Sequence, residues 1–131
     1  MVSVSLPNSM SEVESVLKHP DVWPGWSENA PTDTPLPDIL YLLALDNNDI
    51  AGVFNFNTLY EGVEVHAGFL PKYRGQFAVD AAKAMFDWIY SNTDYTAIYS
   101  SISIHRPEVM KYASLTGMVK EEVLYRHDRI A

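Results

Sequence analysis

Apolar and polar side chains alternate over several short stretches of the chain, and this pattern predicts β-strands. Residues 39–45 (ILYLLAL) are continuously apolar, which is typical of a strand covered on both faces. Residues 46–49 (DNND) have the composition of a turn and predict a hairpin with the strand that follows. Together the expected strands are 2–6, 39–45, 50–57, 63–70 and 96–104, with a closing strand region over 119–130.

Three stretches have helical periodicity instead. They run from Ser9 or Ser11 to about Lys18, from near Gly75 to about Asn92, and from Pro107 to about Thr116. The resulting order, β-α-β-β-β-α-β-α-β, indicates an α/β (α+β) fold with one mixed sheet and helices on both faces. No linker or repeat divides the chain, so a single domain over residues 1–131 is expected.

One segment has no regular pattern. Residues 20–37 contain five of the eight prolines, together with Trp23 and Trp26. Two tryptophan side chains rarely stay in a fully solvated loop. We expect them to pack onto the domain, or else to line a cleft.

The amino-acid composition limits which ligands, metals and macromolecules the protein is expected to bind. The net charge of -8 disfavours nucleic acid and favours cationic partners such as amines. The absence of cysteine excludes disulfides and thiolate catalysis, and no two histidines have a local metal-ligand spacing, so no metal is expected. The chain has no apolar run long enough to span a bilayer and no signal-peptide pattern, so a cytoplasmic protein without membrane contact is expected.

The candidate chemistry lies in residues 63–85, where a strand leads through an Arg-Gly loop into the long amphipathic helix. The first turn of a helix leaves N–H groups without intrahelical partners. Together with the helix dipole, these groups favour an anion. This predicts a phosphate-bearing ligand, such as a nucleotide-like cofactor.

The element order and two motifs resemble the GNAT superfamily of N-acetyltransferases over roughly residues 2–127. Pro71, Tyr73 and Arg74-Gly75 match the lead-in P-x-Y-R-G of the family's pyrophosphate loop, Q/R-x-x-G-x-G/A, and Gly117 matches a glycine after its last helix. Phe77 and Val79 stand where the loop has small residues. The resemblance implies a GNAT fold whose fourth and fifth strands splay around the cofactor, which would be acetyl-CoA or another acyl-CoA.

The resemblance also implies site residues. The cofactor-binding positions would be Phe69, Leu70, Arg74, Gly75, Gln76, Phe77, Ala78, Val79 and His105. Glu61 and Glu64 lie near the start of the fourth strand, where the family often keeps its general base, and His66 shares a face with Glu64. The alternative for these two residues is a solvated Glu–His pair.

The last helix departs from the family. Ala113 stands where many members have a tyrosine that protonates the leaving thiolate, and Tyr112 lies about 100° around the helix from that position. Tyr125 and His127 alternate on the closing strand, where relatives shape the acceptor pocket, but core and rim packing is the favoured role for these two residues.

Two main hypotheses follow. The first is an acyl-CoA-dependent N-acetyltransferase that transfers an acetyl group to a primary amine, small-molecule or peptide, by direct attack in a ternary complex. The second is a non-catalytic GNAT-fold structural or assembly protein, of the kind that tailed bacteriophages encode, without cofactor binding. An α+β domain outside this superfamily is a third interpretation. Aromatic residues near Trp23, Trp26 and Tyr125 are compatible with a homodimer.

Overall fold

The structure is a computed structural model that describes residues 1–101, 107–121 and 124–130. The strands are β1 (Val2–Ser5), β2 (Leu40–Asp46), β3 (Asp49–Leu59), β4 (Gly62–Phe69), β5 (Ala97–Ser101), β6 (Val119–Glu121) and β7 (Leu124–Asp128). The helices are α1 (Met10–Leu17), α2 (Trp23–Trp26), the 3-10 turn η1 (Pro71–Tyr73), α3 (Gln76–Asn92) and α4 (Pro107–Leu115).

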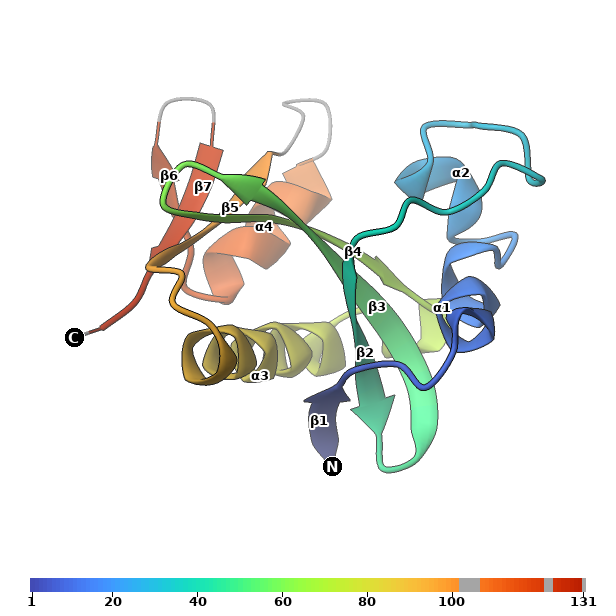
Figure 1. Cartoon of the computed structure of the whole chain (residues 1–131), viewed down its shortest axis with the longest axis horizontal. Helices are drawn as coiled ribbons and strands as arrows, with labels where there is room; N and C mark the ends of the chain where they lie inside the picture. The colour runs from blue at the N-terminus through green and yellow to red at the C-terminus, as the bar shows by residue number, and fades with distance from the viewer. Residues whose placement is uncertain (102–106, 122–123, 131) are drawn as a thin grey trace.

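All seven strands form one sheet in the order β1-β2-β3-β4-β5-β7-β6 (Figure 1). Only β4 and β5 run parallel to each other, and every other neighbouring pair is antiparallel. The parallel pair is joined by α3, the crossover helix that a parallel connection requires. The predicted mixed, mostly antiparallel α/β sheet is confirmed.

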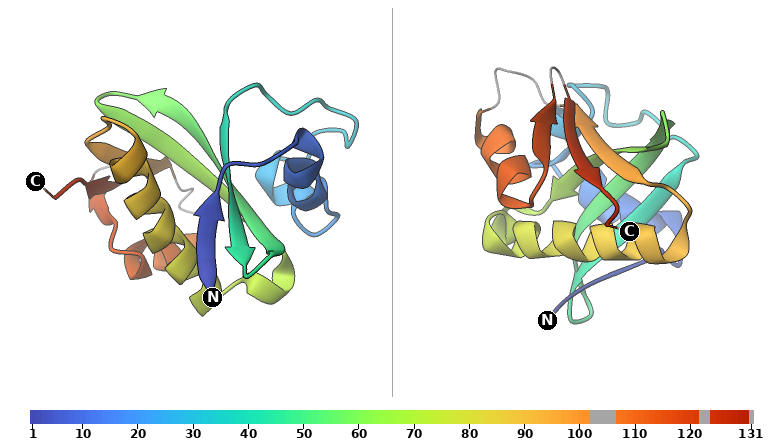
Figure 2. Two further views of the ribbon diagram at one scale, coloured as in Figure 1. Left: turned by 60° about the horizontal axis from the view of Figure 1, so that its bottom comes forward. Right: turned by 90° about the vertical axis from the view of Figure 1, so that its left-hand side faces the viewer.

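Helices cover both faces of the sheet (Figure 2). On one face, α1 and the segment after it close a core that includes Val13, Leu17 and Val53. On the other, α3 and α4 close a larger core around Phe54, Met85 and Ile98. Because side chains alternate along a strand, β2 and β3 contribute to both cores, with Leu42 and Phe54 in the larger core and Leu43 and Val53 in the other.

β4 shows this division most clearly. Val63, Val65 and Phe69 belong to the core under α3. Gly68 faces the other way, since a Cβ added there would lie 2.9 Å from Leu17 of α1. By alternation, the even-numbered residues of β4 therefore face α1 and α2.

The proline-rich segment is more ordered than its composition predicts, because it contains the short helix α2. Trp23 is 3% exposed and donates its ring N–H to the Ala30 carbonyl at 2.7 Å. Trp26 donates to the Asn55 side-chain oxygen at 2.9 Å. The prediction that both tryptophans pack onto the domain is confirmed.

The closing region, predicted as one strand, is a hairpin of β6 and β7, and β7 pairs with β5. The described part of the fifth strand ends at Ser101, so the rest of that prediction, 102–104, lies outside the described residues. No helix in the described ranges is long and apolar enough to cross a membrane.

Candidate functional site

The connection from β4 to α3 ends at Gly75, the residue that caps α3. Its φ of +119° lies in a region that residues with a Cβ rarely adopt. A Cβ added there would meet no heavy atom within 4 Å, so the glycine is required by the backbone conformation and not by crowding. This conformation turns the chain directly into α3 at the C-terminal end of β4.

The first turn of α3 has unpaired donors. The N–H groups of Gln76, Phe77 and Ala78 have no acceptor among the residues that the structure describes. The first amide of the helix with a partner is that of Val79, which donates to the Gly75 carbonyl at 3.2 Å. Three adjacent N–H groups at the positive end of a helix dipole can bind an anion such as a phosphate.

The two bulky residues of this turn pack against the core, Phe77 partly buried and Val79 fully. The Phe77 ring lies 4.9 Å from the Tyr73 ring, centroid to centroid, and contacts the core under α3. Val79 is buried. The Gln76 side chain donates to Asp80 one turn further along the helix, at 2.9 Å.

Arg74 does not stand free beside the loop. Its Nε donates to the Phe69 carbonyl at 3.1 Å, and one terminal nitrogen donates to the Asp21 carbonyl at 2.7 Å. The guanidinium thus ties the end of β4 to the segment between α1 and α2. Sequence reasoning missed this role, because the Asp21 carbonyl lies 53 residues away in the chain.

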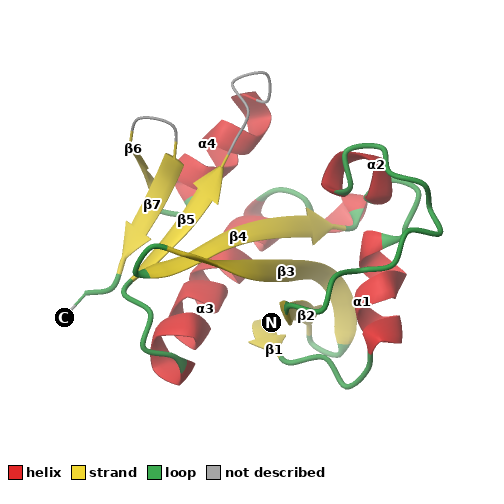
Figure 3. Ribbon diagram, turned by 45° about the horizontal axis from the view of Figure 1, so that its top comes forward, coloured by secondary structure: helices red, strands yellow, loops and turns green. Residues whose placement is uncertain are grey.

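β4 and β5 diverge beside this turn. Among the residues that the structure describes, they pair at Val63–Ile98 and Glu64–Tyr99, close to the N-terminal end of β4. Figure 3 shows the two strands separating toward their C-terminal ends. This is the splay that the family resemblance implies.

Beyond Glu64, the N–H and C=O groups of successive β4 residues point alternately toward β3 and toward the gap beside β5. Leu70 donates its N–H to the Ala51 carbonyl at 3.0 Å and accepts from the Tyr73 N–H at 2.9 Å, so both of its groups are used internally. Since polar groups alternate in direction along an antiparallel strand, those of Ala67 and Phe69 point to the β5 side. There the Phe69 carbonyl binds Arg74, and its N–H faces the gap.

The structure brings Glu64 and His66 together, as the alternation predicts. Glu64 Oε1 lies 3.1 Å from His66 Nε2, and both side chains are partly exposed. Glu64 is opposite Tyr99, the second of the two β4–β5 pairs that the described residues form, so Glu64 and His66 lie on β4 at and just beyond these pairs. A neutral histidine that donates from Nε2 to a carboxylate presents the lone pair of Nδ1, which can accept a proton.

Glu61 has different surroundings. Its Oε1 accepts hydrogen bonds from the Tyr99 hydroxyl at 2.7 Å and from Arg126 at 2.6 Å. The Tyr99 hydroxyl bond, with smaller contributions from its own backbone N–H and from Arg126, holds the pKa of the Glu61 carboxyl below its usual range. Burial and the same hydrogen bond raise the pKa of Tyr99 to about 12. Glu61 is thus a weaker base than an ordinary glutamate, and neither partner was visible in the local sequence.

α4 offers a different contact from the one expected in the family. Ala113 is 3% exposed and belongs to the core. Tyr112 donates its hydroxyl to the Ala78 carbonyl in the first turn of α3, at 2.9 Å, and burial raises the pKa of that hydroxyl. His105, predicted near the thiol end of the cofactor, lies outside the described residues.

The packing role expected for two residues of the closing strand, Tyr125 and His127, is confirmed. Tyr125 is buried in the core under α3, and the His127 ring stacks on Phe86 of α3 at 4.0 Å. Both side chains therefore lie on the opposite face of the sheet from Glu64 and His66.

Solved structures share this architecture. The chain is similar to aminoglycoside acetyltransferase AAC(6')-Ib in complex with coenzyme A and kanamycin, at 11% identity and TM-score 0.78 over 98% of this chain and 95% of that one. It is similar to ribosomal-protein-S5-alanine acetyltransferase from Vibrio fischeri, at 15% identity and TM-score 0.67 over 97% and 92%. A third is spermidine/spermine N-acetyltransferase SpeG from Vibrio cholerae, at 11% and 0.67 over 96% and 92%.

At such low identities these likenesses show the fold alone, and that fold is the one of the GNAT acetyltransferases. No curated protein matches the chain by sequence. A family model described as "Protein of unknown function (DUF2824)" matches residues 11–124. That match covers most of the chain, and the protein belongs to this family.

Proposed function

We propose that the protein binds acetyl-CoA, or a related acyl-CoA, and transfers the acyl group to a primary amine by direct attack in a ternary complex. One observation carries this proposal. The unpaired N–H groups of Gln76, Phe77 and Ala78 begin α3 beside the point where β4 and β5 diverge. A phosphate site and an open strand edge, side by side, suit a long ligand with a diphosphate at one end.

The residues present fit such a ligand. The three helix N–H groups would hold the diphosphate, and the outward backbone groups of Ala67 and the Phe69 N–H would bind the amide-bearing arm. The open space around Gly75 and the inward packing of Phe77 and Val79 support close approach of a ligand to this turn. Bound there, acyl-CoA supplies an activated thioester.

The general base would be His66, oriented by Glu64. His66 Nδ1 would take the proton of the substrate ammonium, directly or through a water, while the Glu64 carboxylate stabilises the imidazolium. The amine nitrogen then forms the new C–N bond as the C–S bond breaks, and the sulfur leaves with its electron pair. Glu61, which the sequence also suggested, is held by Tyr99 and Arg126 and would shape the acceptor side instead.

Calorimetric titration of the purified protein with CoA and with acetyl-CoA tests the first half. We expect saturable binding of both, with inorganic pyrophosphate as a weak competitor. No heat at millimolar ligand would remove the enzyme hypothesis. Where binding is present, release of CoA thiol from acetyl-CoA in the presence of a panel of primary amines tests the second half.

The last helix, α4, favours the alternative hypothesis, a non-catalytic GNAT-fold assembly protein. The usual tyrosine position is the buried Ala113, and the neighbouring Tyr112 hydroxyl is bound to Ala78. This alternative expects no thiol release with any amine. It also expects Phe77→Gly to gain CoA affinity by removing a ring beside the diphosphate turn, whereas the enzyme hypothesis expects no gain.

A further inference from the structure

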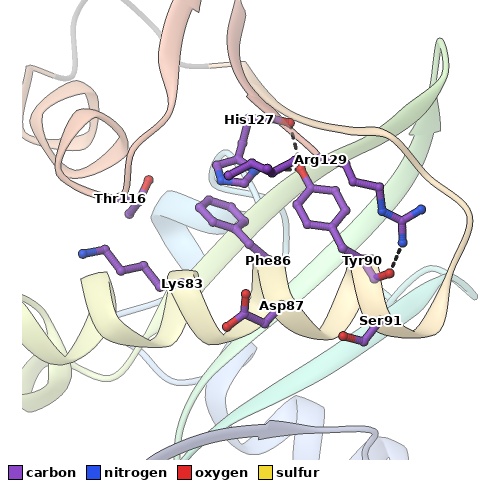
Figure 4. Close-up of a pocket in the computed structure, with 9 residues that line it drawn as sticks. Lys83, Phe86, Asp87, Tyr90, Ser91, Thr116, His127 and Arg129 are labelled. Carbon is purple, nitrogen blue, oxygen red and sulfur yellow. Dashed lines mark hydrogen bonds between the residues drawn. The ribbon is translucent and has the colours of Figure 1, made fainter.

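A second hollow lies on the other side of the molecule from the Glu64–His66 pair. It has a volume of about 570 Å³ and is lined by Lys83, Phe86, Asp87, Tyr90, Ser91, Thr116, His127, Arg129 and Ile130 (Figure 4). These residues come from the middle and C-terminal part of α3, the end of α4 and the end of the chain after β7. The size is within the range of small-molecule sites.

Its inner wall is aromatic. The rings of Phe86 and His127 are stacked at 4.0 Å with an interplanar angle of 22°. The Tyr90 ring lies 5.4 Å from that of His127 at 21°. Figure 4 shows the three rings side by side above α3. Such a wall favours an apolar or planar group.

The rim carries both signs of charge. Lys83 and Asp87 stand one turn apart on α3 and are exposed. In the part of the chain that the structure describes, neither makes a hydrogen bond or an ion pair, with each other or with another residue. Arg129 differs, because its guanidinium is bound to the carbonyls of Tyr90 and Thr93.

The inner part of the hollow offers acceptors. The Tyr90 hydroxyl lies 2.9 Å from the His127 carbonyl and 2.7 Å from His127 Nδ1, and both contacts are hydrogen bonds in the tautomer in which Nδ1 carries the hydrogen. Nε2 of the neutral ring then keeps its lone pair, and burial lowers the pKa of His127 and favours that neutral form. Thr116, 4% exposed, donates its hydroxyl hydrogen to Ala113 and keeps acceptor capacity.

We propose that this hollow binds a small zwitterion of the α-amino acid class with an apolar or aromatic side chain. The ligand carboxylate lies at the Lys83 ammonium, its ammonium group between Asp87 and Nε2 of His127, and its side chain against Tyr90 and Ile130. A ligand with only a negative charge is repelled by the Asp87 carboxylate, and a ligand with only a positive charge is repelled by the Lys83 ammonium. Only a ligand with both charges pairs both groups.

This inference does not depend on the proposed acyl transfer. Lys83 lies about two turns beyond Gln76 along α3, so the two ligands occupy different ends of that helix. Binding here would be measurable even in a protein that binds no CoA.

Amide chemical-shift mapping with the ¹⁵N-labelled protein tests the site, with L-phenylalanine as the probe. We expect saturable shifts at millimolar ligand, confined to residues 83–91, 116 and 127–130. Phenethylamine, which lacks the carboxylate, and 3-phenylpropionate, which lacks the ammonium, should each bind roughly tenfold more weakly, as for the loss of one charged contact.

Two variants assign the charges. In Lys83→Met, phenylalanine should no longer bind more tightly than phenethylamine. In Asp87→Asn, phenylalanine should no longer bind more tightly than 3-phenylpropionate. Lys111→Met and Asp49→Asn, matched exposed charges elsewhere, should change neither ratio. Shifts at other positions, equal binding of the three probes, or no shift with phenylalanine would each overturn the proposal.

Discussion

The hydroxyl of Tyr112 on α4 donates a hydrogen bond to the carbonyl of Ala78 in the first turn of α3, at 2.9 Å. It joins the two helices on one face of the sheet at the turn whose N–H groups are proposed to bind a diphosphate. Tyr112→Phe should lower the free energy of unfolding in urea by about 1 kcal/mol, because the hydrogen bond that joins the two helices is lost. Tyr60→Phe is the control: its side chain is 78% exposed, and it should change stability little.

The same tyrosine predicts a pH dependence. Burial raises the folded-state pKa of Tyr112 above the ordinary value of 10.0. The unfolded chain therefore loses this proton first, and its contribution to stability is fully present below pH 10.0 and lost as the pH rises above it. Above pH 10.0 the free energy of unfolding, measured with urea at a series of pH values, should fall less steeply with pH in Tyr112→Phe. The difference in steepness should be up to about 1.4 kcal/mol per pH unit. Equal slopes in the two proteins would contradict the assignment.

The main-chain donors of α3 can be tested by removing one of them. Gln76→Pro deletes the first N–H of the helix at a position where proline is tolerated. We expect the CoA dissociation constant to rise roughly tenfold, as for one charge-assisted hydrogen bond, with the helical circular dichroism unchanged. Gln76→Ala keeps the N–H and loses only the side-chain contact to Asp80, so it should bind like the parent. Equal affinity of the two variants would exclude this donor.

Glu64 is expected to act through His66. Glu64→Gln keeps the shape of the pair but removes the charge that stabilises the imidazolium. The kcat for acyl transfer should fall at least roughly tenfold, with an unchanged KM for acetyl-CoA. Glu14→Gln, an exposed glutamate of α1, provides the matched control. A KM effect without a kcat effect would assign Glu64 to binding.

Gly62 tests how closely β4 approaches β5 where the two strands still pair. A Cβ at this position would lie 1.8 Å from the Ala97 carbonyl oxygen. Gly62→Ala must therefore push the strands apart and should lower the free energy of unfolding by about 1–3 kcal/mol. Gly75→Ala tests backbone conformation without crowding, because the site has open space but a φ of +119°, and the substitution should cost about 1–3 kcal/mol. Thermal unfolding of both variants measures the two costs.

Local patterns of apolar and polar residues were sufficient to predict most of the strands and helices. The alternation in residues 50–57 and 63–70 and the helical periodicity from near Gly75 to about Asn92 predicted β3, β4 and α3 close to their observed bounds. Two predictions failed locally: α2 forms in a proline-rich segment, where Pro24 suits a first helical turn, and the closing region divides into a hairpin.

The site was less predictable, because its contacts join distant residues. Glu64 and His66 are two positions apart, and strand alternation sufficed to pair them. Glu61 instead depends on Tyr99 and Arg126, which are 38 and 65 residues away. The face occupied by His127 depends on how β7 pairs with β5, and no local pattern determines that.

Arg74 binds carbonyl oxygens alone, those of Asp21 and Phe69. Every amino acid supplies the same carbonyl, so the exposed Asp21 side chain can be exchanged without loosening the tie, whereas Phe69 is also a core residue. An engineer could therefore graft new residues into the stretch that follows α1, and so redesign which molecules that side of the sheet recognises, while the single arginine keeps the stretch anchored.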